Sequence, residues 1–88
     1  MIAHENGTLE WYENGMLHRE DGPAVIHANG SKDWCLRGRV HRNDGPAAEH
    51  EDGSFSWYLD GRNYPYMTWL EKTDCSDEQK VMIRLIYG

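Results

Sequence analysis

The chain has 88 residues, with 15 Asp and Glu against nine Lys and Arg and a formal net charge of −6. This length fits one domain with a small core, and the acidic balance argues against direct binding to nucleic acid, which relies on clustered Lys and Arg. No apolar run approaches the roughly 20 residues of a membrane span and no segment has the pattern of a secretory leader, so we expect an intracellular, cytoplasmic protein.

An internal repeat organises the sequence up to Tyr64. The heptapeptide His-Arg-Glu-Asp-Gly-Pro-Ala at 18–24 returns as His-Arg-Asn-Asp-Gly-Pro-Ala at 41–47, a shift of 23 residues. The same shift relates tryptophans, glycines and histidines along the chain, namely Trp11, Trp34 and Trp57, Gly7, Gly30 and Gly53, Gly15, Gly38 and Gly61, and His4, His27 and His50. A fixed period of this size is typical of stacked supersecondary units. We place the units at 7, 30 and 53, preceded by a single strand of an incomplete unit.

Each unit is expected to contain two tight hairpins. One set of turns is marked by Asn6-Gly7 and its equivalents, and a second by Asn14-Gly15 and its equivalents, because Asn-Gly and Asp-Gly favour two-residue hairpin loops. Between turns the side chains alternate with period two. We expect the tryptophan face to form the core, and the opposite face to present Glu10, Tyr12, Asp33 and Tyr58 to a partner.

The repeated heptapeptide is expected to form a structural corner. Its Asp-Gly-Pro part is typical of turns, since Asp bonds its own backbone, Gly adopts unusual angles and Pro fixes φ. Its His-Arg-x-Asp part is interpreted as a hydrogen-bonded link between successive hairpins, made by His18, Arg19 and Asp21 and by His41, Arg42 and Asp44.

The tail after the repeats is predicted to be helical. Pro65 suits the first turn of a helix that runs to about Lys72, and Ser76 to Gln79 match a capping box at the start of a second helix. An apolar stripe on that helix, Val81, Met82, Leu85 and Ile86, is expected to pack on the last hairpin, with an exposed, partner-binding helix as the alternative. The sequence therefore predicts one domain, 1–88: an open antiparallel β-meander of hairpin repeats (1–64) closed by one or two C-terminal helices (65–88).

The segment from Trp11 to His18, with its repeat period and the closing Asn29-Gly30, resembles the MORN repeat, a family of short hairpin units. The resemblance implies stacked hairpins that act as scaffolds for protein or lipid contact. The sequence departs from the family after the histidine, where the corner replaces a compact His-Gly-x-Gly. The whole pattern also resembles small uncharacterised proteins of large tailed phages, and some variants resemble antitoxin components.

Catalytic chemistry has little support in the sequence. The repeated histidines could line up in columns, but no Cys or carboxylate completes a metal-ligand spacing. His18 and Asp21 lack a repeated Ser or Cys nucleophile beside them. Cys35 and Cys75 are far apart in the sequence and are expected to be free thiols. We therefore assign no catalytic residue, no metal ligand and no cofactor.

The sequence thus predicts a non-enzymatic protein-binding module, monomeric or a small homo-oligomer, whose acidic repeat surface binds a basic protein. The phage resemblance implies an inhibitor or antitoxin that acts on a host protein. One alternative is a small metal-dependent or hydrolytic enzyme that uses the His and Asp columns. The other is a structural protein that self-assembles through its open sheet edges.

Overall fold

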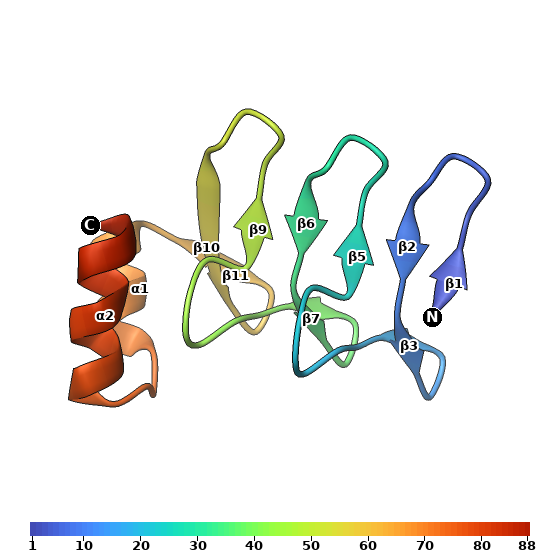
Figure 1. Ribbon diagram of the computed structural model, residues 1–88. Coiled ribbons are helices and arrows are strands. Elements are labelled where there is room, and N and C mark those ends of the chain that lie inside the picture. Colours follow the sequence, from blue (N-terminus) through green and yellow to red (C-terminus); the bar gives the residue numbers. More distant parts are fainter.

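Hairpins stacked side by side build most of the molecule, and two helices close one end, as the computed structural model of residues 1–88 shows (Figure 1). The strands are β1 (Ile2–Ala3), β2 (Leu9–Glu10), β3 (Tyr12–Glu13), β4 (Met16–Leu17), β5 (Val25–Ile26), β6 (Lys32–Asp33), β7 (Cys35–Leu36), β8 (Arg39–Val40), β9 (Ala48–Glu49), β10 (Phe55–Leu59) and β11 (Arg62–Tyr64). The helices are α1 (Tyr66–Lys72) and α2 (Asp77–Tyr87), which together form the helical cap.

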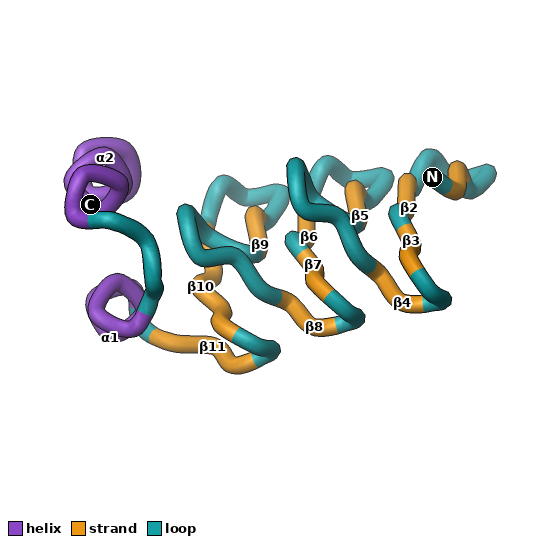
Figure 2. Tube along the Cα trace, turned by 90° about the horizontal axis from the view of Figure 1, so that it is seen from below, coloured by secondary structure: helices purple, strands orange, loops and turns teal.

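Each repeat unit contributes to two rows of hairpins. The upper hairpins, β1–β2, β5–β6 and β9–β10, join with β11 into one antiparallel sheet of seven strands in the order β1-β2-β5-β6-β9-β10-β11. The lower hairpins are β3–β4, β7–β8 and β10–β11, and the first two are separate two-stranded sheets. Seen from below, the lower hairpins extend to one side of the upper row (Figure 2). The predicted mainly-β fold, an open meander with a C-terminal helical cap, is confirmed.

The turns of the lower hairpins have the predicted geometry, but those of the upper hairpins do not. Asn14, Arg37 and Asp60 have φ of 52°, 51° and 51°, and each is followed by a glycine with positive φ, as a two-residue primed turn requires. In the upper turns only the glycine has positive φ. The Gly7 N–H donates to the His4 carbonyl at 3.0 Å, so these loops contain three residues, with glycine in the left-handed position.

The strands of the first two units break at tryptophan. The Trp11 N–H donates to the Ala24 carbonyl at 2.8 Å, and the Trp34 N–H donates to the Ala47 carbonyl at 2.7 Å. These bonds draw the backbone after each corner directly against the strand. The Trp11 and Trp34 carbonyls accept the N–H groups of His18 and His41 in the lower hairpins, so the chain passes from the upper to the lower hairpin at each tryptophan.

This break overturns the prediction of a continuous tryptophan core. Trp11 and Trp34 are only half-buried, while Cys35, assigned by alternation to the open face, is 4% exposed. Apart from Trp57 in the third unit, the buried residues of the repeats are small: Gly22, Ala24, Val25, Cys35, Gly45, Pro46, Ala47 and Ala48.

The large core lies between the last unit and the helical cap. Trp57, Trp69, Leu70 and Ile83 form one buried cluster, with the Trp57 and Trp69 ring centroids 4.6 Å apart. Ser76 makes the predicted capping box with Gln79. Neither helix has the length and apolar character needed to cross a membrane.

The packing of α2 differs from the prediction. Ile83 is the buried residue of this helix, and Tyr87 also packs against the core cluster. The predicted stripe is left mostly uncovered: Val81, Met82, Leu85 and Ile86 are 51%, 56%, 76% and 66% exposed. The stripe and the packed face lie on different sides of the helix, because Ile83 and Tyr87 are one turn apart on the side that meets Trp57 and Trp69.

Candidate protein-interaction site

The repeated corner is an arginine stacked on a tryptophan. In the second corner (His41–Ala47) the Arg42 Cζ lies 3.8 Å from the Trp34 ring centroid. Its Nε donates to Asp44 Oδ1 at 2.9 Å and its Nη1 donates to the Pro46 carbonyl at 3.1 Å. The first corner (His18–Ala24) repeats all three contacts with Arg19, Trp11, Asp21 and Pro23. Each guanidinium therefore shields an indole ring and satisfies a turn carbonyl.

The corner glycines are required by this stack. A Cβ on Gly45 would lie 2.7 Å from the Arg42 Cζ, and one on Gly22 would lie 2.8 Å from the Arg19 Cζ. The guanidinium is thus held between an indole ring on one side and a glycine backbone on the other. Only a residue without a side chain permits this approach.

The corner histidines link successive units. The Nδ1 atom of His18 accepts the Arg37 N–H at 2.9 Å, and that of His41 accepts the Asp60 N–H at 2.9 Å. Each histidine therefore binds the lower turn of the following unit. Through these contacts His18, Arg19, Asp21, His41, Arg42 and Asp44 hold the array together.

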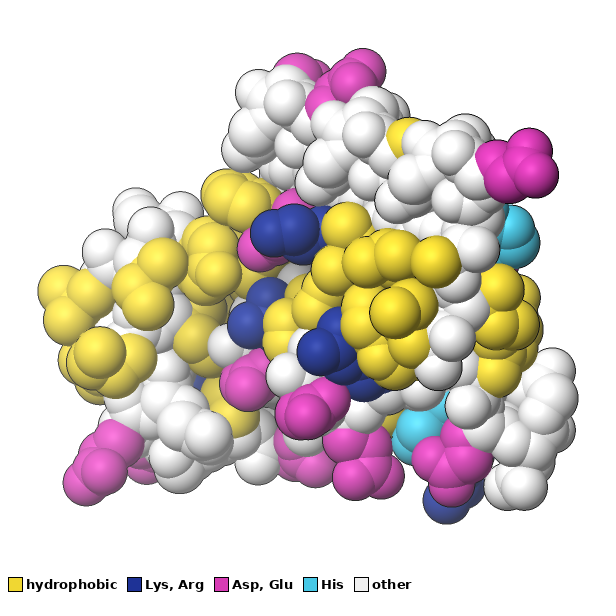
Figure 3. Space-filling view, turned by 45° about the vertical axis from the view of Figure 1, so that its right-hand side comes forward, with side chains coloured by type: hydrophobic (Ala, Val, Ile, Leu, Met, Phe, Trp, Pro, Cys, Tyr) yellow, Lys and Arg dark blue, Asp and Glu magenta, His cyan; other side chains and the backbone are white.

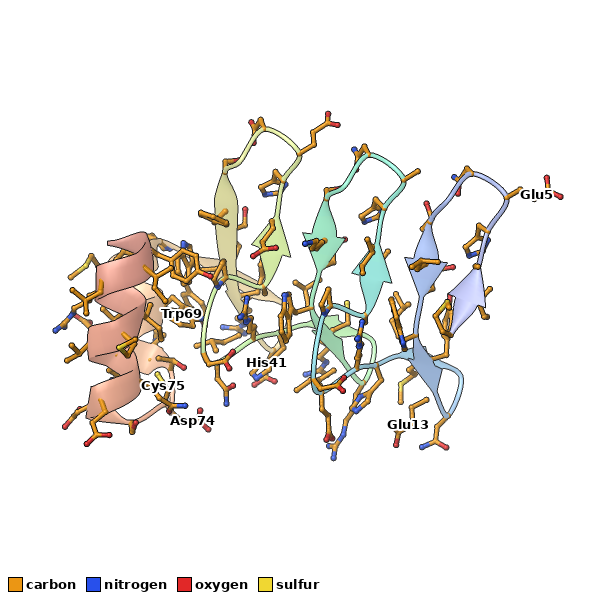
Figure 4. All side chains as sticks on the ribbon, in the orientation of Figure 1. Glu5, Glu13, His41, Trp69, Asp74 and Cys75 are labelled. Carbon is orange, nitrogen blue, oxygen red and sulfur yellow. The ribbon has the colours of Figure 1, made fainter.

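The second corner also anchors the helical cap. Trp69 Nε1 donates to the Arg42 carbonyl at 3.2 Å, Thr73 Oγ1 donates to the Asn43 carbonyl, and Asn43 Nδ2 donates to Asp74 Oδ1 at 2.8 Å. Trp69 points from α1 toward the last unit, with Asp74 below it (Figure 4). In the third unit the Trp69 ring covers Trp57, as arginine covers the other two tryptophans.

Two of the predicted partner-binding residues lie together at the N-terminal end of the array. The Tyr12 hydroxyl donates to Glu10 Oε2 at 3.1 Å, and His4 Nε2 bonds the other oxygen of the same carboxylate. The bond to His4, with help from Tyr12, lowers the pKa of Glu10, and the bond to Glu10 raises the pKa of Tyr12. Tyr12 is 45% exposed, so this pair is open to a partner.

The other two predicted residues lie further along the array. Asp33 is paired with His27 at 2.7 Å, and Tyr58 is half-buried on β10. Glu10 and Asp33 share a row of the upper sheet, separated by Val25, which is only 6% exposed. Directly opposed residues point to the same face of a sheet, so Glu10 and Asp33 flank Val25 on one face, while Tyr58 lies further along the array on β10.

The histidine column of the upper hairpins is engaged within the hairpins. His4, His27 and His50 bond Glu10, Asp33 and Ser56, in each case the residue six positions later. No group of three or more His, Cys, Asp or Glu side chains comes together in a way that could hold a metal ion.

An exposed apolar stripe lies on α2 and has no packing partner within the chain. The apolar stripe, Val81, Met82, Leu85 and Ile86, occupies the outer side of the terminal helix, and Met67 of α1 is exposed as well. Hydrophobic atoms gather at this helical end of the molecule, on the left in Figure 3. A cavity of about 390 Å³ lies beside the stripe, lined by Met82, Ile83, Ile86 and Tyr87 together with the second corner and Glu78. The period of the sequence locates these side chains but does not give their orientation.

The exposed surface of the whole molecule is acidic. Of the 15 carboxylates, 12 are exposed, among them Asp44, Asp74, Asp77 and Glu78, whereas five of the nine Lys and Arg are exposed. The difference arises partly because Arg19 and Arg42 are held in the corners. The exposed surface therefore carries a stronger acidic excess than the composition alone indicates.

These features define a hairpin-repeat protein with a helical cap, whose outer face carries an exposed apolar stripe with Glu78 beside it. No family model, curated protein or solved structure matches the chain. A function is therefore argued from the geometry of the chain itself.

Proposed function

We propose that this protein is a non-enzymatic protein-binding module that docks on a partner with a basic surface. The observation that carries the proposal is the apolar stripe on α2, where four large side chains on one helix face are each more than half exposed. A contiguous apolar patch rimmed by polar residues is typical of an interaction site on a soluble protein.

The stripe has the arrangement of a helix that anchors in an apolar groove. Val81, Met82, Leu85 and Ile86 recur at the spacing by which helices present anchors to such grooves. Burial of each side chain contributes about 1.5 to 3 kcal/mol, part of which offsets the entropy lost on association. Leu85, at 76% exposed, has the most to gain.

Charge supports a basic partner. Asp77 and Glu78 lie in the first turn of α2, and Glu78 lines the cavity beside the stripe. Lys and Arg around the partner's groove would complement these carboxylates and accelerate association, most strongly at low salt.

The Glu10–Tyr12 pair, with Asp33 and Tyr58, is a second candidate surface for the same partner or for another. The resemblance to phage proteins and to antitoxin components favours a role as an inhibitor that occupies a host protein. An acidic module that covers a basic functional surface fits that role.

A comparison of two double variants tests which surface binds. Met82→Lys with Leu85→Lys alters the stripe, and Glu10→Lys with Asp33→Lys alters the repeat face; each variant carries two new lysines. A protein captured by wild type from the native cells is purified, and its dissociation constant with each form is measured at low and high salt. We expect at least a tenfold loss for the stripe variant and weaker binding of wild type at high salt.

Three results would contradict the proposal in different ways. Loss of binding only in the Glu10 and Asp33 variant would move the site to the repeat face. Unchanged binding in both variants would show that neither the stripe nor the repeat face is the binding site. If light scattering shows that wild type is a dimer and the stripe variant a monomer, the stripe is a self-association surface instead.

A further inference from the structure

A polar cavity lies at the lower hairpin of the second unit, β7–β8. Its volume is about 450 Å³, and its lining consists of His18, Glu20, Leu36, Arg37, Arg39, His41 and Asp60. All three units contribute to it, since the lining comes from the first corner, the β7–β8 hairpin, the second corner and the β10–β11 turn. The interaction surfaces described above do not use this cavity.

His41 offers the cavity an unsatisfied donor. Its Nδ1 accepts the Asp60 N–H, so the neutral ring carries its proton on Nε2. In the first unit the equivalent Nε2 of His18 faces two carboxylates, those of Glu13 and Glu20, at 3.4 and 3.5 Å. The positions 23 residues later hold Leu36 and Asn43. The His41 Nε2 has no carboxylate or other protein acceptor, and the ring is one of the labelled side chains in Figure 4.

Two arginines without an ion-pair partner lie at the β7–β8 turn. Arg19 and Arg42 are each paired with an aspartate, but Arg37 and Arg39 take part in no ion pair. Both line the cavity, and the stem of Arg39 lies over Gly61 of the next unit, 3.8 Å from the position of a Cβ there. Their guanidinium groups supply fork-shaped donors suited to an oxyanion.

Arg37 differs in residue type from the equivalent positions of the other two units. This residue has φ of 51°, a left-handed conformation that the equivalent turns fill with Asn14 and Asp60. Asn and Asp tolerate this region far better than arginine does. A residue that weakens its own turn while aiming a charge at a cavity is the pattern expected of a functional position.

We propose that this cavity binds a carboxylate, held by the guanidinium groups of Arg37 and Arg39 and by the His41 Nε2–H. A singly charged group fits better than a doubly charged phosphate, because Glu20 and Asp60 in the lining already balance the two arginines. The carboxylate belongs either to a small free acid or to an acidic side chain of a peptide. This site is independent of the proposed partner surface on α2.

Binding is tested by titration of the isotope-labelled protein with propionate, with the peptide acetyl-Gly-Glu-Gly-amide and with inorganic phosphate. We expect propionate or the peptide to shift the Arg37 and Gly38 amide signals and the His41 ring signals with a saturable response. The probe that saturates at lower concentration identifies the source of the carboxylate. Stronger binding of phosphate than of either carboxylate, or no saturable shift with any probe, would overturn the proposal.

The repeat itself supplies the variants. Arg37→Asn and Arg39→Met introduce the residues that the first unit has at the same positions, so neither should harm folding, and the first should favour the turn. Each is expected to weaken carboxylate binding at least tenfold. Arg62→Met, in the same column of the third unit but outside the cavity lining, is the matched control and should bind like wild type. Equal binding by Arg37→Asn, Arg39→Met and wild type would refute the assignment.

Discussion

At the scale of single residues, each corner arginine makes three different contacts at once. Each guanidinium covers an indole, pairs with an aspartate and donates to the carbonyl that follows the glycine. The conspicuous Asp-Gly-Pro pattern is therefore more than turn chemistry, because the glycine admits the arginine and the arginine shields the tryptophan.

Gly45→Ala should lower the free energy of unfolding by about 2 to 4 kcal/mol. The new Cβ would meet the Arg42 guanidinium and displace it from Trp34, with loss of a cation–π contact of about 0.5 to 2 kcal/mol and of hydrogen bonds of about 1 kcal/mol each. Chemical denaturation measures the change. In an Arg42→Ala background the same substitution should cost markedly less, and equal costs in both backgrounds would show that the arginine is not the cause.

Cys35 should make stability fall at alkaline pH. Burial, assisted by the charge of Asp33, raises the pKa of this thiol from its ordinary value to about 11. The folded protein then holds the thiol proton more tightly than the unfolded chain does, so stability is complete below about pH 9 and declines toward pH 11. The difference between wild type and Cys35→Ala in denaturation midpoints across this range isolates the effect, because other groups titrate in both proteins. A difference that does not vary with pH would contradict it.

At the scale of elements, α2 illustrates the limit of periodicity. Its capping box and its span could be predicted from Ser76, Gln79 and the apolar spacing, because these signals are local. Its rotation about its own axis could not, since that depends on the shape of a core built by Trp57 and Trp69. The apolar residues surround more than half of the helix, and the sequence alone does not distinguish the packed side from the exposed one.

Ile83→Ala and Leu85→Ala form a matched pair for this orientation. Ile83 is 4% exposed and Leu85 is 76% exposed. Removal of a buried isoleucine costs about 2 to 5 kcal/mol, whereas an exposed leucine lies within about 0.5 kcal/mol of neutral. Thermal denaturation followed by circular dichroism should show a large drop in Tm for the first variant only. A larger drop in Tm for Leu85→Ala than for Ile83→Ala would show that the stripe, and not the Ile83 side, packs against the core.

In the repeat units too, some features could be predicted from the local sequence and others depend on contacts between distant residues. The period and the lower turns follow from glycine and asparagine spacing. The half-burial of Trp34 does not, because it depends on the change from the upper to the lower hairpin at that residue and on the Arg42 guanidinium that covers the ring. Alternation puts Glu10 and Asp33 at equivalent positions of their units, but it does not give the pairing with Val25 that sets them in one row of the sheet.

At the scale of the whole molecule, burial is distributed unevenly from end to end. The helical end contains the large aromatic cluster, while the opposite end finishes in β1, whose two residues are both exposed and which pairs only with β2. Stability that depends on contacts between neighbouring units is expected to decrease toward the open end.

Hydrogen exchange should follow this gradient. Amides of β9, β10 and α1 are expected to exchange most slowly, those of β5 and β6 at an intermediate rate, and those of β1 and β2 first. Mass spectrometry of peptides from the exchanged protein measures the order. Uniform protection from β1 to β10 would show instead that the array opens as one cooperative unit.

The linkage of each corner to the turn of the next unit has a consequence for the length of this architecture. A unit passes on the same contacts that it receives: a histidine that accepts a turn N–H, an arginine over a tryptophan and a short connection back to the upper sheet. The helical cap, however, fits one particular corner, because Asn43 bonds Asp74 where the first corner has Glu20. Growth of the array is thus possible by insertion ahead of the last corner, in whole steps of 23 residues, while the closing end stays unchanged. Insertion of a fraction of a unit would shift tryptophan, arginine and histidine out of alignment together, so the architecture admits only discrete lengths.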